Sequence, residues 1–189
     1  TTGARPHAVV ELLHTRCPVR VHVHTGLDGA PFLQRWLEIR NEDTKPVGIS
    51  AADTWSGIMA EGDAFPEPDS LSTPYSLGWF AGNNWAREGR FVWEPLTSSV
   101  TRHLTMRGPY GTSGYQCPFF LLRRDRPPEQ YFVFSLAWSG PWQARVLSDA
   151  GLYQVLQVRM GLEGPAPLRV LAPGEMAVVP ALHIGAVAG

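Results

Sequence analysis

The chain has 189 residues, of which 44% are hydrophobic, so it is long enough and apolar enough to form one domain with a buried core. Sixteen Lys and Arg residues against 17 Asp and Glu residues give a net charge of −1, and we expect no nucleic-acid partner because such surfaces carry excess positive charge. No run approaches the about 18 consecutive apolar residues of a membrane helix, so we expect no membrane partner. The first residues show no signal-peptide pattern, which predicts a cytoplasmic protein.

Charged residues make up only 17% of the chain, which is low for a free-standing soluble domain. One interpretation is a general composition bias. The other is that a partner or a neighbouring domain covers part of the surface.

The strand pattern begins early in the chain. Gly (19 residues) and Pro (17 residues) interrupt nearly every window long enough for a helix. Residues 18–24 alternate Val with Arg or His, which predicts a strand with its valines on one face. A second strand is predicted over 32–41, with Leu33, Leu37 and Ile39 on one face, and a third over 46–53.

The middle of the chain is less regular. Residues 62–74 hold three prolines and several acids and predict an exposed loop. Further strands are predicted over 75–80, 88–94, 100–106, 118–124, 131–138, 143–147, 152–160 and 176–182. Ten or more strands at about ten-residue spacing are typical of an all-β, antiparallel β-sandwich with little helix, and we predict one such domain over 1–189.

Residues that could carry chemistry give weak patterns. His22 and His24 would share one strand face, as two metal ligands can, but no known ligand spacing surrounds them, so we interpret them as a solvent-facing pair and assign no metal. The acids that could serve glycoside chemistry are Asp53, Glu61, Asp63, Glu67 and Asp69, but their spacing does not show that two converge.

No nucleophile motif and no nucleotide-binding glycine motif is present, so we predict no catalytic residue and no cofactor. The two cysteines, Cys17 and Cys117, are interpreted as buried thiols. A disulfide between them is the alternative.

Seven tryptophans are the more informative set, because indole rings stack on the apolar faces of sugars. We expect at least four of them in the core, since Trp buries a large area. Our candidates for carbohydrate or interdomain contact lie near Gly, Asn and Ser, and they are Trp55, Trp79, Asn83, Asn84 and Trp85.

Several segments, taken in order, resemble the N-terminal β-domain of glycoside hydrolase family 36, the α-galactosidase or melibiase family. They are RWLEIRNEDTKPV (35–47), LGWFAGNNWARE (77–88), RGPYGTSGYQCPFF (107–120), FSLAWSGPW (134–142) and LAPGE (171–175). Two departures occur within 107–120. Gly114 and Tyr115 stand where the family has His, and Cys117 stands where it has Asn.

The resemblance implies a β-supersandwich of the galactose-mutarotase type and an enzyme whose catalytic carboxylates lie in a following (β/α)₈ barrel. Such a barrel needs about 250 residues. We therefore expect the chain to be the later portion of a non-catalytic β-domain, inactive alone, that supports the missing barrel and contributes to its galactoside pocket or to a homo-oligomer interface.

Two other functions remain open. A free-standing carbohydrate-binding sandwich would bind sugar alone. A mutarotase-like sugar epimerase would need an acid and a base at the sugar, for which His103 or His183 with a Glu are the candidates.

Overall fold

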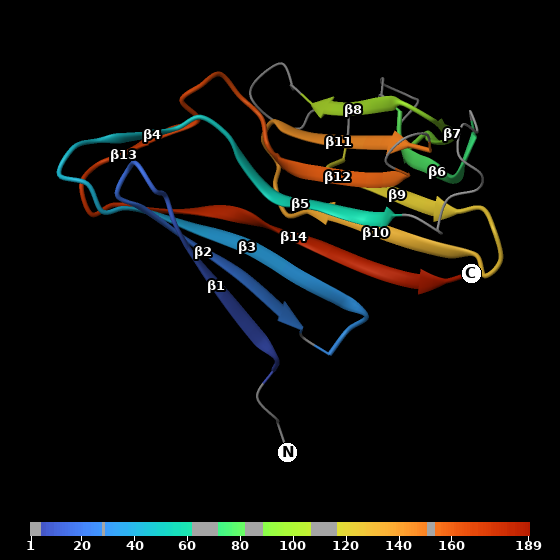
Figure 1. The fold of residues 1–189 in the computed structure, drawn as a ribbon, viewed down its shortest axis with the longest axis horizontal. Coiled ribbons are helices and arrows are strands. Elements are labelled where there is room, and N and C mark those ends of the chain that lie inside the picture. Colours follow the sequence, from blue (N-terminus) through green and yellow to red (C-terminus); the bar gives the residue numbers. More distant parts are fainter. Residues whose placement is uncertain (1–4, 28, 62–71, 82–88, 107–116, 151–153) are drawn as a thin grey trace.

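The computed structural model describes residues 5–27, 29–61, 72–81, 89–106, 117–150 and 154–189. These residues contain fourteen strands and no helix, which confirms the all-β prediction (Figure 1). No helix in these ranges is long and apolar enough to cross a membrane. The strands are β1 (His7–Leu13), β2 (Val19–Leu27), β3 (Phe32–Asn41), β4 (Val47–Ile49), β5 (Ala52–Glu61), β6 (Ser72–Phe80), β7 (Phe91–Thr97), β8 (Val100–Met106), β9 (Phe119–Arg124), β10 (Gln130–Leu136), β11 (Trp142–Asp149), β12 (Val155–Leu162), β13 (Arg169–Leu171) and β14 (Met176–Ala188).

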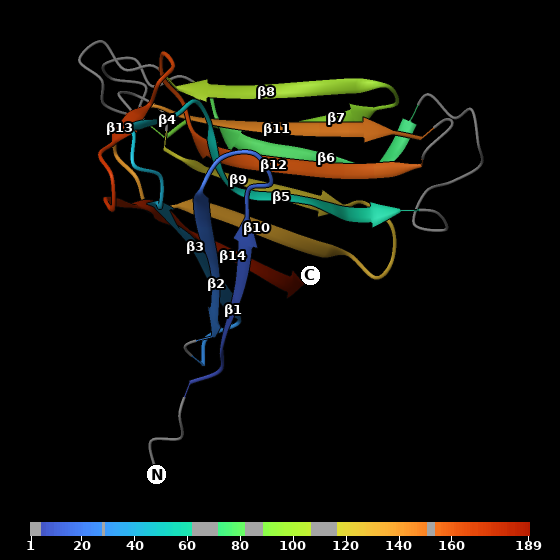
Figure 2. The same ribbon diagram turned by 60° about the vertical axis from the view of Figure 1, so that its left-hand side comes forward.

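Two antiparallel sheets form the predicted sandwich. The large sheet has eight strands in the order β1-β2-β3-β14-β10-β9-β6-β7, and the small sheet has four in the order β5-β12-β11-β8. β4 and β13 form a two-stranded sheet, which lies at one end of the molecule (Figure 1). β1, β2 and β3 extend away from the rest of the sandwich, and we call these three strands the wing (Figure 2).

The main core lies between the two large layers. Phe120 and Phe134 of the large sheet are fully buried and stack with ring centres 4.6 Å apart. From the small sheet, Trp142, Val158 and Met160 belong to the same buried cluster. Alternating apolar residues on both sheets face this interior, as packed antiparallel sheets require.

A second core lies where the wing meets β4–β13. Val23 of β2 and Leu37 and Ile39 of β3 are buried there with Leu171 and Val179. Since these are the residues that the two-residue alternation assigned to one face, the structure confirms the face assignment for 18–24 and 32–41.

The buried side chain of Asn41 joins three segments near this second core, and we call this arrangement the Asn41 corner. Its Nδ2 donates to the carbonyls of Lys45 (2.8 Å) and Leu171 (3.0 Å), and its Oδ1 accepts from the amide of Asp43 (2.8 Å). Gly174, at φ +77°, donates its amide to the Asn41 carbonyl at 2.9 Å. Glycine suits this left-handed turn because it has no Cβ to clash.

Some predictions differ from the structure. The strand predicted over 46–53 is divided into β4 and the start of β5, because the chain leaves one sheet and enters another at Ser50 and Ala51. The loop predicted over 62–74 is too long at its end, since Ser72–Phe80 form β6, and 62–71 lie outside the described residues. Cys17 and Cys117 are free and exposed rather than buried, because each lies just outside a strand end.

Candidate functional site

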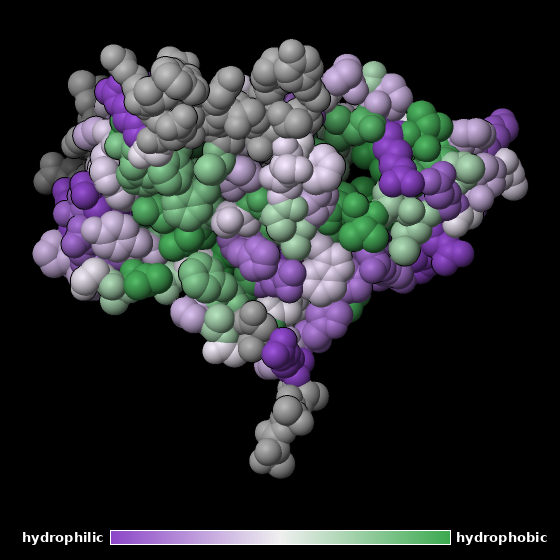
Figure 3. Space-filling view, turned by 180° about the vertical axis from the view of Figure 1, so that it is seen from behind, coloured by the Kyte–Doolittle hydropathy of each residue, from purple (hydrophilic) through white to green (hydrophobic). Residues whose placement is uncertain are grey.

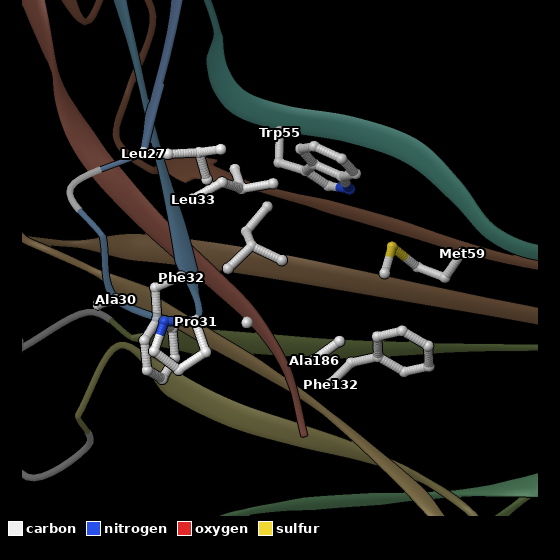
Figure 4. Close-up of a pocket in the computed structure, with 11 residues that line it drawn as sticks. Leu27, Ala30, Pro31, Phe32, Leu33, Trp55, Met59, Phe132 and Ala186 are labelled. Carbon is white, nitrogen blue, oxygen red and sulfur yellow. The ribbon is translucent and has the colours of Figure 1, made fainter. Parts of the chain in front are cut away.

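An apolar hollow of about 460 Å³ opens between β5 and the ends of β2, β3, β10 and β14. β5 is the edge strand of the small sheet, so one side of the sandwich stays open beneath it. Trp55 and Met59 project from β5 toward Leu33 and Phe132 across the hollow (Figure 4). The full lining is Leu27, Ala30, Pro31, Phe32, Leu33, Trp55, Met59, Phe132, Ile184, Gly185 and Ala186.

The Trp55 ring is fixed by its two neighbours. Gly57, two residues along β5, leaves room for the indole, whose nearest atom would lie 3.1 Å from a Cβ at that position. The guanidinium carbon of Arg35 lies 5.1 Å from the ring centre, in a cation–π contact. Burial lowers the pKa of Arg35. A sugar stacking on the indole would therefore compete with Arg35 for that ring face.

The other predicted contact residues are spread over different elements. Trp79, near the end of β6, packs half-buried against the main core. It lies in the large sheet, whereas Trp55 lies in the small one. Asn83, Asn84 and Trp85 lie outside the described residues.

The outer face of the large sheet carries an aromatic group that the sequence did not indicate. Trp93 of β7 lies 5.5 Å from Phe91 and 6.2 Å from Tyr131, measured between ring centres. Arg123 places its guanidinium carbon 4.8 Å from the centre of the Trp93 ring. Gly78 lies beneath, where a Cβ would come 2.8 Å from the indole. We call Phe80, Phe91, Trp93, Phe119 and Tyr131 the outer aromatic face.

Trp93 remains 38% exposed, and β1 and β14 carry further exposed apolar side chains. Seen from the side opposite to Figure 1, the molecule shows green apolar areas separated by polar ones (Figure 3). Exposed aromatic residues beside arginine are typical of contact surfaces between proteins.

The candidate acids and bases are not brought together where the structure describes them. Asp53 accepts from Arg159 at 2.9 Å and 2.6 Å, so its carboxylate is engaged in an ion pair. Glu61 lies at the opposite end of β5 from Asp53, and Asp63, Glu67 and Asp69 lie outside the described residues. His103 pairs with Arg145 on the outer face of the small sheet, whereas His183 pairs with Gln34 and Ser135 on the outer face of the large sheet.

A polar cluster occupies the wing, on the same side of the large sheet as the outer aromatic face. The Glu38 Oε2 atom of β3 lies 3.4 Å from Nε2 of His24 and 3.8 Å from Nδ1 of His22. One ligand atom of each residue lies within 4.8 Å of the others, and all three side chains are partly buried. Two imidazoles and a carboxylate form a common donor set for zinc.

No protein-family model matches the chain. No curated protein matches it either. Solved structures do: an α-galactosidase from Lactobacillus brevis has a TM-score of 0.78 and 17% identity over 100% of this chain. The galactosidase domain of the α-galactosidase-sucrose kinase AgaSK has a TM-score of 0.78 and 20% identity over 96% of this chain. The chain has the fold of part of an α-galactosidase.

A third match extends this result. The GH36 α-galactosidase AgaA from Geobacillus stearothermophilus has a TM-score of 0.76 and 18% identity over 96% of this chain. In each of the three comparisons, this chain spans 24% of the other protein. At these identities, the likeness shows a shared fold.

Within this α-galactosidase-like sandwich, the motifs over 35–47, 134–142 and 171–175, which the structure describes in full, form corners between strands. In 138–142, Trp142 is buried in the main core, and the Trp138 indole donates to the carbonyl of Pro141 at 3.1 Å. Gly140 lies under Trp138, where a Cβ would come 2.7 Å from the indole. These contacts give Trp138, Gly140 and Trp142 a structural role, as Asn41 has at its corner.

Proposed function

We propose that this chain is a non-catalytic β-sandwich portion of an α-galactosidase-type glycoside hydrolase. The observation that carries the proposal is the fold match over 100% of this chain to 24% of the Lactobacillus brevis α-galactosidase. The motifs over 35–47, 77–88, 107–120, 134–142 and 171–175 support it independently, since they occur in the order of the family's N-terminal β-domain.

In this proposal the hydrolytic chemistry belongs to a (β/α)₈ barrel outside this chain. Glycoside hydrolysis needs two carboxylates about 5–10 Å apart across the sugar. Asp53, the one candidate acid described inside a strand interior, is held by Arg159 instead. The engagement of this carboxylate is consistent with a supporting role.

The outer aromatic face is the surface that we assign to contact with the rest of the enzyme. It presents Trp93 beside Arg123, and both residue types are enriched at protein interfaces. We also propose that this portion contributes to the galactoside pocket of the enzyme or to a homo-oligomer interface. The low charge content of the chain supports a partly covered surface.

The first test is turnover of an aryl α-galactoside by the purified chain, beside a complete α-galactosidase of this family as positive control. We expect no release of the aryl group above the buffer rate. Turnover that persists through repurification, and that follows the protein peak, would overturn the non-catalytic assignment. Sequencing the reading frame on both sides of these residues then tests the barrel directly.

The assigned contact surface has its own test, in which this chain and the barrel segment are expressed together and their association is measured by co-purification. We expect Trp93→Ser to weaken the association by at least tenfold. Ile58→Ser is the matched control, because Ile58 is 53% exposed on the other sheet and should leave association unchanged. Equal loss in both variants would refute the choice of surface.

Carbohydrate binding by the isolated chain is a second candidate function, and the hollow beside Trp55 favours it. Its volume of about 460 Å³ and its aromatic lining match ordinary small-molecule sites. Titration with methyl α-galactoside, followed by tryptophan fluorescence, tests this function. Trp55→Leu should abolish the response, whereas Trp138→Leu should retain it. No response in the unsubstituted chain would exclude this sugar as a ligand.

A further inference from the structure

His22, His24 and Glu38 form a cluster whose spacing suits a metal ion. Metal–ligand bonds of about 2.0–2.1 Å in a tetrahedral zinc site place neighbouring ligand atoms about 3.3 Å apart. The Glu38 Oε2 atom lies 3.4 Å from Nε2 of His24 and 3.8 Å from Nδ1 of His22. All three ligand atoms lie within 4.8 Å of one another, so side-chain rotations that shorten these separations would bring them to one ion.

The other nitrogen of each imidazole already has a partner on β1. Nε2 of His22 lies 3.1 Å from Oε2 of Glu11, and Nδ1 of His24 lies 3.1 Å from Nε2 of His7. When His22 and His24 donate these N–H groups, their remaining nitrogens present lone pairs toward Glu38. Metal-binding histidines characteristically donate their second nitrogen to a carboxylate or another acceptor in this way.

The surroundings hold the His24 ring in place and leave its inner nitrogen unused. The ring stacks on Trp36 at 4.7 Å and on His7 at 5.2 Å. Among the described residues, Nε2 of His24 is buried and makes no hydrogen bond. A buried ring nitrogen that faces a carboxylate oxygen at 3.4 Å without a hydrogen bond to it would gain from a cation between the two groups.

The charged residues around the cluster do not oppose a cation. Arg20 is the neighbouring positive group on the same face of β2, and it is paired with Glu11 and Glu42, each at 2.6 Å. Arg40 follows Glu38 on the same face of β3. Against these two arginines, the face carries the carboxylates of Glu11, Glu38 and Glu42.

We propose that the wing binds one divalent transition-metal ion of the zinc type, held by Nδ1 of His22, Nε2 of His24 and the carboxylate of Glu38. Water supplies the fourth position, because His22 and Glu38 remain 34% and 28% exposed. The ion joins β2 to β3, and the partners of the histidines extend this link to β1. The site therefore stabilises the wing, whose described packing partner on its inner face is the short β4–β13 sheet.

The test begins with the chain treated with chelator and dialysed, then titrated with Zn²⁺ by calorimetry. We expect one ion per chain and a rise in Tm on binding. Co²⁺ in place of Zn²⁺ should give the visible absorption of a tetrahedral nitrogen–oxygen site. Mg²⁺, a hard cation that prefers oxygen ligands, should not compete.

Variants then locate the ion. Glu38→Gln and His22→Gln should each weaken Zn²⁺ binding by about 100-fold. Glu11→Gln, which alters a partner shared by His22 and Arg20, should weaken it by about tenfold. His103→Gln is the matched control, because this histidine is exposed on the other sheet. The Zn²⁺ affinity of this variant should equal that of the unsubstituted chain.

Far-UV circular dichroism checks that each variant keeps its strand signal. The proposal is overturned if the unsubstituted chain takes up no Zn²⁺. It is also overturned if Glu38→Gln and His22→Gln, folded by circular dichroism, bind the ion as tightly as the control variant.

Discussion

Replacing Asn41 with alanine should destabilise the protein strongly without disturbing its surface. The side chain is fully buried, and it makes the hydrogen bonds to Lys45, Leu171 and Asp43 that join β3, the following turn and β13. Alanine removes all of these bonds at once. The carbonyl of Leu171, in a buried part of the structure, then loses a donor that water cannot easily replace.

The size of the effect follows from these bonds. Each intramolecular hydrogen bond contributes about 0.5–1.5 kcal/mol net, and a buried group left without a partner costs about 1–3 kcal/mol. Three lost bonds, with one buried carbonyl among them, give an expected loss of about 3–4 kcal/mol in the free energy of unfolding. This is a large part of the stability of an ordinary domain.

Urea unfolding followed by tryptophan fluorescence measures this loss, provided that the slope with denaturant is unchanged. Thr44→Ala is the control, because its exposed hydroxyl makes only a 3.4 Å contact with Asp43 in the same turn. That variant should change stability by less than about 0.5 kcal/mol. A loss below about 1 kcal/mol for Asn41→Ala would refute the role given to the corner.

Two other substitutions test packing and electrostatics. Gly161→Ala should lower the free energy of unfolding by about 3 kcal/mol, because the new Cβ would meet the Ala52 carbonyl oxygen and lie 2.5 Å from Cα of Asp53. Gly164→Ala is the control, since its Cβ would meet only the Leu168 side chain. Equal urea midpoints for the two variants would contradict this prediction. Arg20→Gln should flatten the acid dependence of stability, measured by urea unfolding across a pH series. Hydrogen bonds from Arg20 lower the pKa of Glu11 and of Glu42 below 4.5 in the folded chain. The two ion pairs therefore stabilise the fold above the unfolded pKa, and their contribution is lost as pH falls through the folded pKa. An unchanged slope below pH 4.5 would show that these ion pairs contribute nothing.

Alternation along single strands made much of the fold predictable. Residues 32–41 and 100–106 coincide with β3 and β8, since each run is bounded by turn residues. β1 was not predicted, because Val9, Val10, Leu12 and Leu13 place apolar groups on both faces and give no two-residue period. β13, with three residues, is too short to show any period.

The tryptophans show where composition misleads. At least four of the seven were expected in the core. Among the six that the structure describes, Trp142 is fully buried, and Trp55 and Trp79 pack half-buried against the main core. Trp93 and Trp138 lie over Gly78 and Gly140 instead. A sequence shows that glycine and tryptophan are present, but only strand register shows that one lies under the other.

The cluster of His22, His24 and Glu38 could be predicted only in part from the sequence. His22 and His24 were correctly predicted to share a face, because they lie two residues apart on one strand. Glu38 is joined to them by the pairing of β2 with β3, which places it directly opposite His22. No spacing within one strand reveals a ligand that comes from the neighbouring strand.

The position of β14 has a consequence for how the chain is made. Among the described strands this one follows all the others in sequence, yet it lies between β3 and β10 in the middle of the eight-stranded sheet. During synthesis, the facing edges of β3 and β10 therefore stay unpaired until β14 has left the ribosome. Until then the hydrogen-bonding edges of these two strands are open to pairing with other chains, which is a condition that favours aggregation.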